Sequence, residues 1–492
     1  MNGRSAVVVG AGVGGITAAT YLAKAGIHVT VVEKDAAPGG RCGRLVHDGH
    51  RFDTGPTLFV MPRLYESEFA ALGASVSECL DLRRVDPTYR LVFDDGEQLS
   101  LTSDMAVMRR QLEAIEPGSF RGLERYLEAG ARHYPVIAEK MVRRAFHHPW
   151  DYLRIGALRL LLRGNPLASH YRTMASYFDS PRLKSAFTFQ DLYVGLSPFQ
   201  APAILSLLSY TELADGVWYP AGGMYSIVEA LVGLARAAGV ELRFGVPVTR
   251  IDTRGDRASG VTFADGASIE ADVVLANADL PYVYDQLLPA DGTADALSRK
   301  QFSSSAISFF WTLDRPAGSL APHTLFLADA YRENFDAIVR DLDLAADPSV
   351  YVHAPARLDP SVAPPGGDAV TAIVPVGHLR TDDTRDWDAL RDRAREHVFR
   401  RLRSIGQDIR AGVTFEASMT PATWAQRLNL AKGATHGLAH TITQMGWLRP
   451  SNRHRRYRNL YFAGASTHPG TGVPTAMASG RLAATRIIAD LR

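Results

Sequence analysis

The sequence predicts an α/β protein: a parallel β-sheet flanked by helices, with an inserted α+β region. Three observations predict this class. A short strand, a glycine-rich turn and a helix open the chain, strand segments follow near residues 239–276, and residues 459–491 repeat the strand–turn–helix pattern. The 492 residues exceed the roughly 250–300 at which a single hydrophobic core stops growing, so we expect more than one domain.

The opening segment reads as a complete βαβ unit. Residues 6–10 are an apolar, β-branched run typical of a buried parallel strand. Residues 10–15 match the pattern G-x-G-x-x-G, residues 16–25 are a small-residue helix, and residues 28–32 are a second strand that ends before Glu33. Because the glycine turn lies between a strand and a helix, this order predicts a Rossmann-like fold.

The glycines of this unit and the acidic residue after it suit a dinucleotide. Gly10 permits the tight turn, Gly12 lets the backbone approach a pyrophosphate, and Gly15 allows the helix to pack closely on the strand. Gly14 belongs to the same turn, and the helix presents free N–H groups to the phosphates. Glu33 can accept hydrogen bonds from ribose hydroxyls, and its charge disfavours a 2′-phosphate. A purely structural glycine turn is the alternative.

Two later parts of the chain complete the predicted sheet. Residues 239–276 contain several strand segments, among them a hairpin around a D-G turn. A strand at 459–463 leads into a glycine-rich turn at 464–474 and a helix from about residue 475 to residue 491. A helix that begins after such a turn is again a place where anions bind.

The motif order predicts a discontinuous cofactor-binding domain with substrate-binding segments inserted between its parts. The cofactor-binding domain is expected to comprise 1–57, 239–299 and 446–492, and the substrate-binding domain 58–238 and 300–445, with 137–200 as a helical subregion. Within that subregion, residues 137–163 mix basic and apolar side chains, which suits a membrane interface. A solvated helix that covers the core is the alternative. Residues 449–458 form a second arginine-rich stretch.

Composition and charge exclude several classes. The formal net charge is only +2 and neither arginine-rich stretch has interleaved aromatic residues, so we expect no nucleic-acid partner. Cys42 and Cys79 are too few for a disulfide framework, and His147-His148 lack a third ligand, so we expect no metal site and a reduced, cytoplasmic protein. We expect no secretory signal, and no apolar run approaches the roughly 20 residues of a membrane span.

Four further motifs carry a resemblance to a known family. Glu33 is followed by Pro38-Gly-Gly-Arg41 and then by Phe52-Asp-Thr-Gly-Pro-Thr57, while Trp218-Tyr-Pro-Ala-Gly-Gly223 and Thr467-His-Pro-Gly-Thr-Gly-Val-Pro474 come later. The first two resemble the FAD-containing amine oxidase and desaturase superfamily. The other two resemble the bacterial and fungal-type phytoene desaturases, FAD-dependent enzymes of carotenoid biosynthesis.

This resemblance implies FAD as the cofactor, in a Rossmann-like domain of the glutathione reductase and amine oxidase type. Val248 is then expected against the adenine, with a plain core position as the alternative. The helix after the second glycine turn is expected to face the flavin ring. The residues implied in FAD binding are Gly10, Gly12, Gly14, Gly15, Glu33, Lys34, Gly40, Arg41, Gly55, Pro56, Thr57, Val248, Gly464, Ala465, Gly472, Val473 and Pro474.

The implied activity is removal of hydrogen from a C–C bond beside a polyene, with a hydride passing to the flavin and a proton lost from the neighbouring carbon. The implied partners are a long apolar polyene, oxygen or a quinone as electron acceptor, and the cytoplasmic membrane, at which the protein would be peripheral. Asp151 and Arg154 share one helix face and are the candidates for handling the proton, with a surface ion pair as the alternative. His468 is a second candidate.

Other functions fit the same motifs. A carotenoid cis–trans isomerase, a polyene oxygenase or a desaturase of another polyene would keep the FAD-binding residues. A different class is a lipid carrier without redox activity, since the GDP-dissociation inhibitors resemble this fold and bind prenyl groups. The intact glycine motif at 10–15, Glu33 and the turn at 464–474 disfavour the carrier.

Overall fold

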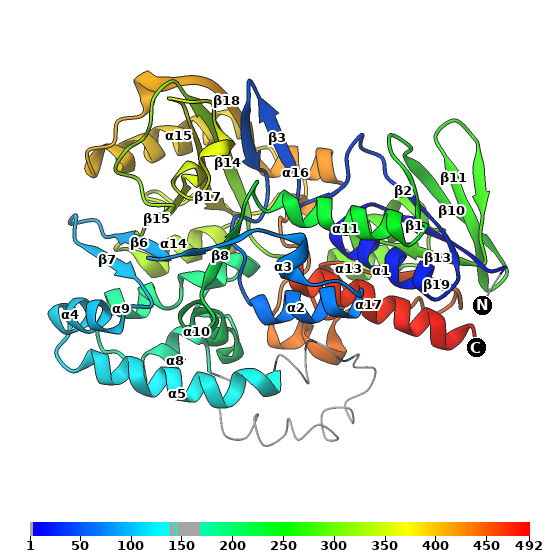
Figure 1. Ribbon diagram of the computed structural model, residues 1–492, viewed down its shortest axis with the longest axis horizontal. Coiled ribbons are helices and arrows are strands. Elements are labelled where there is room, and N and C mark those ends of the chain that lie inside the picture. The colour runs from blue at the N-terminus through cyan, green and yellow to red at the C-terminus, as the bar shows by residue number, and fades with distance from the viewer. Residues whose placement is uncertain (1–2, 138–141, 143, 145–167) are drawn as a thin grey trace.

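The computed structural model describes residues 3–137, 142, 144 and 168–492 (Figure 1). Its organising element is a five-stranded parallel sheet in the order β19-β13-β1-β2-β9. The strands are β1 (Ser5–Val9), β2 (His28–Val32), β9 (Glu241–Arg243), β13 (Val273–Ala276) and β19 (Leu460–Phe462). The beginning, middle and end of the chain therefore meet in one sheet.

The central strand of this sheet is buried on both faces because its side chains are short and apolar. Val7 and Val8 have no exposed surface. In the parallel register, Val7 pairs with Val274 of β13 on one side and with Thr30 of β2 on the other. A parallel sheet of this kind needs a layer on each face.

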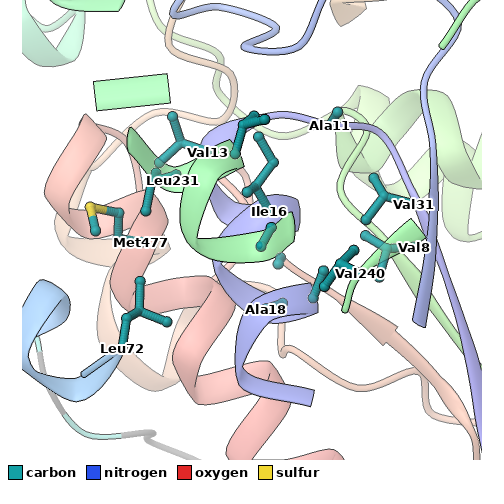
Figure 2. Packing of buried hydrophobic residues seen from close by; sticks show 14 of the residues in the cluster. Val8, Ala11, Val13, Ile16, Ala18, Val31, Leu72, Leu231, Val240 and Met477 are labelled. Atoms are coloured by element: carbon teal, nitrogen blue, oxygen red, sulfur yellow. The ribbon is translucent and has the colours of Figure 1, made fainter. Parts of the chain in front are cut away.

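Four helices form the layer on one face. They are α1 (Val13–Lys24), α2 (Pro62–Ala71), α11 (Tyr225–Ala237) and α17 (Val473–Asp490). Figure 2 shows part of their shared core, with Ile16 from α1, Leu231 from α11 and Met477 from α17. Although α2 and α11 lie within residues 58–238, they pack on the parallel sheet and its helices. The division into domains stays a prediction.

The other face carries a small antiparallel sheet, β10-β11-β12. Its strands are β10 (Val248–Arg254), β11 (Arg257–Phe263) and β12 (Ser268–Glu270). Ile251, Val261 and Phe263 pack against the valines of the parallel strands. The hairpin predicted around the D-G turn is the β11–β12 pair.

A second, seven-stranded sheet has the order β18-β14-β17-β16-β15-β6-β7. Its strands are β6 (Tyr89–Val92), β7 (Gln98–Leu101), β14 (Ser305–Leu313), β15 (His323–Phe326), β16 (Val350–His353), β17 (Asp368–Val376) and β18 (Val413–Met419). Helix α15 (Trp387–Ser404) packs on this sheet, where Phe399 stacks on the fully buried Trp311 with 5.0 Å between ring centroids.

Helices form a third region beside the seven-stranded sheet (Figure 1). They are α4 (Met105–Ile115), α5 (Ser119–Ile137), α8 (His170–Met174), α9 (Pro181–Ala186), the 3₁₀ helix η2 (Phe189–Val194), α10 (Ser206–Ala214) and α14 (Tyr331–Val339). In the described part of the chain, the remaining strands and α-helices are β3 (Arg44–His47), β4 (His50–Asp53), α3 (Val76–Cys79), β5 (Leu82–Val85), β8 (Val217–Pro220), α12 (Leu280–Tyr282), α13 (Thr293–Ser298) and α16 (Pro421–Leu428).

The predictions on membrane contact and on proton handling concern residues that lie mostly outside the described part of the chain. Asp151 and Arg154 lie outside the described residues, as does most of the basic and apolar stretch at 137–163. Among the helices that are described, none combines the length and the mean hydropathy that a bilayer crossing requires.

Candidate active site

A cavity of about 830 Å³ connects the parallel sheet with the seven-stranded sheet and the helical region. One end lies where β1 and β2 finish, and Gly10 and Glu33 line it. Ligands of open parallel sheets bind at this edge, outside the carboxyl ends of the strands. The other end is lined by Leu192 of η2, Leu208 of α10 and Ile373 of β17.

The glycine turn after β1 leaves room that a side chain would fill. Gly10 has a φ of +97°. A Cβ on Gly12 would lie 2.7 Å from Oδ1 of Asn277, and a Cβ on Gly15 would lie 2.3 Å from the carbonyl oxygen of Gly10. Gly15 does not line the cavity. It lies against the Gly10 carbonyl and lets α1 pack closely on the end of β1. Gly12 and Gly14 do line the cavity and expose their backbone there.

Asn277 is the polar side chain that joins this turn to the rest of the cavity. Its Nδ2 donates a hydrogen bond to the carbonyl of Ala463 at 2.9 Å. Its Oδ1 is buried and has no partner among the described atoms. An unpaired buried oxygen on a cavity wall indicates that a ligand or an ordered water normally pairs with it.

Glu33 is fixed at the end of β2 by two backbone groups. Its Oε2 accepts a hydrogen bond from the N–H of Ala11 at 2.7 Å, and its Oε1 accepts one from the N–H of Asp35 at 3.0 Å. Burial nevertheless raises the pKa of Glu33 above its ordinary value. Each carboxylate oxygen keeps a lone pair for a ligand hydroxyl. Lys34 also lines the cavity and pairs with Asp35 at 2.8 Å.

A second helix N-terminus opens on the same cavity. Helix α17 begins after Gly472, whose φ is +114°, and Val473 and Pro474 line the cavity beside it. The turn is held by His440, whose Nε2 accepts a hydrogen bond from the N–H of Thr471 at 3.1 Å. Since a glycine has no side chain to cap the helix, its first N–H groups are available to an anionic or electron-rich ligand.

Arg41 and the residues around it line the cavity between the two helix N-termini. Its Nη2 lies 3.7 Å from Oδ1 of Asp279, and its Nη1 donates to the carbonyl of Thr435 at 3.3 Å. Burial lowers the pKa of Arg41, and the Asp279 carboxylate opposes that shift. A Cβ on Gly55 would lie 1.9 Å from the Arg41 carbonyl oxygen, so this crossing requires glycine.

Arg449 holds the loops around the second helix N-terminus together. It is 3% exposed and donates hydrogen bonds to five backbone carbonyls: those of Leu438, Ala439, Gln444, Ala465 and Thr467. Burial lowers the pKa of Arg449 to about 9. This arginine therefore does not belong to a basic surface, although the sequence places it in the stretch at 449–458.

The far part of the cavity is mainly apolar. Its apolar lining includes Phe189, Leu192, Val194, Ile204, Leu205, Leu208, Leu325 and Ile373. A polar group enters this wall at Thr57, whose hydroxyl lies 2.7 Å from that of Tyr351. The Tyr351 hydroxyl in turn lies 2.7 Å from Nδ1 of His323. Long apolar ligands fit such a chamber because its walls exclude water.

The structure brings almost all of the sequence-predicted cofactor residues to one cavity. Besides those described above, Gly40, Pro56, Val248, Gly464 and Ala465 line it, and Gly15 alone of the predicted set does not. His468 is buried outside the lining, and its Nε2 lies 2.7 Å from the carbonyl of Arg144. Sequence reasoning missed Tyr351 and His323, because each lies in a short, largely buried strand that carries no functional motif.

The chain matches the family model described as flavin containing amine oxidoreductase over residues 13–488. It is 42% identical to the phytoene desaturase of Fusarium fujikuroi, in an alignment that covers 99% of this chain and 90% of the relative. It is 41% identical to the zeta-carotene-forming phytoene desaturase of Myxococcus xanthus, over 99% and 94% of the two chains. Putrescine oxidase bound to putrescine has a similar solved structure, with a TM-score of 0.63 and 17% identity over 99% of each chain.

Proposed function

Since the chain belongs to the family of flavin containing amine oxidoreductases and the relatives that it matches over nearly its whole length include phytoene desaturases, we propose that it is an FAD-dependent carotenoid desaturase. It introduces double bonds into phytoene or a related carotenoid precursor. One observation carries the proposal: a single cavity joins a dinucleotide cradle to an apolar chamber. An enzyme that oxidises a long hydrocarbon needs both in direct contact.

The residues present fit FAD. Glu33 binds the ribose hydroxyls, the backbone of Gly12 and Gly14 and the N-terminus of α1 bind the pyrophosphate, and Val248 packs on the adenine. The unpaired Oδ1 of Asn277 would accept a hydrogen bond from a hydroxyl of the cofactor or from an ordered water beside the glycine turn. When bound, FAD supplies the acceptor for a hydride.

The protein's own part is to bind the hydrocarbon, orient it and exclude water. With FAD bound, the N-terminus of α17 would stabilise negative charge on the part of the cofactor beside it. The apolar side chains of η2, α10 and β17 hold the polyene by the hydrophobic effect, which has no directional preference. The bound chain can therefore slide along the chamber between successive reactions.

Product analysis tests the proposal against its alternatives. Purified protein loaded with FAD is incubated with liposomes that contain phytoene and a quinone or oxygen as acceptor. New conjugated double bonds, seen as absorbance at longer wavelength with consumption of acceptor, are expected. A rearranged spectrum without acceptor consumption would favour the isomerase, an oxygenated product the oxygenase, and a colourless protein that never takes up FAD the lipid carrier. Liposomes with a saturated hydrocarbon of equal length are the control.

We further propose peripheral contact with the cytoplasmic membrane, with oxygen or a quinone as electron acceptor. Support comes from three exposed apolar side chains, Ile442, Trp447 and Leu448, which flank the cavity-lining Met445. Trp447 is 42% exposed, and tryptophan is favoured at the membrane–water interface. Flotation with liposomes tests this contact: W447E is expected to reduce the bound fraction, and equal flotation of both proteins would contradict it.

A further inference from the structure

A buried polar cluster borders the apolar chamber and is not part of the predicted cofactor site. Glu212 of α10 is its only carboxyl group. The hydroxyl of Tyr89 donates a hydrogen bond to Oε1 of Glu212 at 3.1 Å, and Nε2 of Gln190 donates one to Oε2 at 3.0 Å. The Tyr89 hydroxyl is also hydrogen-bonded to that of Tyr193.

These hydroxyls form a path from the cavity to the carboxyl group. Tyr193 lines the cavity, whereas Glu212 and Tyr89 do not. Glu212 is 4% exposed and Tyr89 is fully buried, so neither meets bulk water. The hydrogen bonds can therefore run in one direction, with Tyr193 donating to Tyr89 and Tyr89 donating to Glu212.

The surroundings of Glu212 permit it to hold or release a proton near neutral pH. Burial raises the pKa of Glu212 to about 7, against the opposing effect of its hydrogen bonds. Those hydrogen bonds come only from neutral groups. Among the residues that the structure describes, the titratable groups that interact with Glu212 are tyrosines from four elements: Tyr89 of β6, Tyr193 of η2, Tyr126 of α5 and Tyr351 of β16.

The path opens at the part of the chamber that borders the cofactor cradle. Tyr351 interacts electrostatically with both Tyr193 and Glu212, and its hydroxyl lies 2.7 Å from that of Thr57. Thr57 follows Gly55, the residue at which the backbone passes directly over the Arg41 carbonyl. A bond of the polyene that reacts beside Thr57 therefore lies within the same polar part of the wall.

We propose that Tyr193, Tyr89 and Glu212 form a proton relay that accepts the proton released each time a double bond is formed; this inference rests on the proposed desaturase function. A carbon next to one that has lost a hydride is strongly acidic. Its C–H bond breaks, the electron pair becomes the new π bond, and the proton passes to the Tyr193 oxygen. The Tyr193 proton moves to Tyr89, and the Tyr89 proton moves to the Glu212 carboxylate. The carboxyl group later gives the proton back along the same path to the oxygen or quinone that serves as electron acceptor. The acceptor takes up the hydride equivalent and this proton together and carries both away before the next turnover.

Within the relay the roles differ. Tyr193 contacts the substrate, and Glu212 acts through it as a positioning residue that also stores the proton. A tyrosine hydroxyl is a weak base, but it suffices here because it gives up its own proton as it receives another. Glutamine at position 212 would keep the shape and the hydrogen bond from Tyr89, and would remove the capacity to accept a proton.

The test compares E212Q and Y193F with the wild-type holoenzyme on phytoene in liposomes. Each variant is expected to lower kcat by about 100-fold with little change in KM, since proton transfer contributes typically 10²–10⁴-fold. The wild-type kcat should fall as the pH drops below about 7, because Glu212 becomes protonated. E212Q should lose this fall. Y461F is the matched control: Tyr461 is buried, its hydroxyl is bonded to Asp490, and it belongs neither to the cavity lining nor to the groups around Glu212, so its kcat should stay within a few-fold of wild type.

A readout apart from turnover separates the relay from the desaturase activity itself. In infrared difference spectra recorded across a pH titration, the wild type should show the C=O band of a buried carboxylic acid disappearing near pH 7, and E212Q should lack this change. If the wild type makes no new double bonds, the proposed function fails. If the wild type desaturates phytoene and both variants match its kcat and its pH profile, the relay alone is refuted.

Discussion

Helices α1 and α17 cross at close range beside the cofactor cradle. A Cβ on Gly480 would lie 2.2 Å from the carbonyl oxygen of Gly14, whereas real Cβ atoms stay at least 3.0 Å from such a neighbour. G480A must therefore separate the helices by about 0.8 Å at this point. Overpacking of this kind costs about 1–3 kcal/mol. The two groups that the new Cβ would meet, the Gly14 carbonyl and the Ala18 amide nitrogen, both belong to the backbone and cannot rotate away.

Two measurements follow from this displacement. If the whole chain unfolds together, about 2 kcal/mol lowers the Tm by about 2 °C, and by more if only the part around the parallel sheet unfolds. The Gly14 carbonyl belongs to the first turn of α1, so the phosphate-binding turn moves as well. We expect G480A to bind FAD about tenfold more weakly, which corresponds to about 1.4 kcal/mol. Thermal unfolding of the apoprotein and FAD titration by flavin fluorescence measure the two effects.

Gly233 provides the matched control. It lies in α11, and a Cβ there would meet nothing within 4 Å. G233A should raise the stability by about 0.5–1 kcal/mol, because alanine has the higher helix propensity, and should leave FAD affinity unchanged. The reasoning would be refuted if G480A and G233A unfolded at the same temperature and bound FAD equally well.

Three further predictions address single side chains. E33Q should weaken FAD binding by about 1.5–3 kcal/mol, since it loses a charged acceptor for the ribose hydroxyls. E241Q, on the exposed strand β9, is the control and should bind FAD as the wild type does; isothermal titration of the apoprotein with FAD measures both affinities. R449K should lose FAD on gel filtration, because a lysine cannot donate hydrogen bonds to all five carbonyls that Arg449 binds, and each carbonyl left unpaired costs about 1–3 kcal/mol. Retention of FAD at the wild-type level would contradict this. Burial lowers the pKa of His353 from 6.5 to about 4, so the unfolded chain binds more protons at this residue between those pH values, and His353 contributes about 3 kcal/mol to a rise of stability with pH across that window. H353F should reduce the rise by about this amount in urea unfolding measured at pH 4 and 6.5, because other buried histidines such as His436 keep their own contributions.

The cofactor side of the cavity could be predicted because its requirements are local. A backbone that approaches a pyrophosphate needs glycine at fixed spacing, and the strands and helices on either side carry their own hydrophobic pattern. Gly12, Gly15 and Glu33 therefore have distinct positions in the sequence before any tertiary structure is known. The second glycine turn, before α17, is recognisable for the same reason.

The rest of the site depends on contacts between distant segments. Arg449 looks like one more basic residue in an arginine-rich stretch, and only the folded chain shows that it bonds carbonyls from two loops. Glu212 lies in α10, and the sequence pattern of this helix does not tell whether its carboxyl group is buried or solvated. Its partners Tyr89 and Gln190 come from other elements. The members of such a cluster are not separated by any characteristic spacing in the sequence, because only tertiary packing brings them together.

The position of Glu212 resolves a conflict that any desaturase of hydrocarbons faces. A carboxylate exposed on the chamber wall would attract water and disfavour the polyene, since an unpaired buried charge costs far more than a buried hydroxyl. A chamber without a base would leave the released proton in an apolar site. Placing the carboxyl group behind two tyrosines satisfies both requirements. Of the groups in this cluster only Tyr193 lines the cavity, and the carboxylate stays hydrogen-bonded to Tyr89 and Gln190. It follows that moving the carboxyl group to the wall, as in Y193E combined with E212Q, should weaken binding of phytoene even though a base is still present. Unchanged affinity of that double variant would contradict this account of the wall.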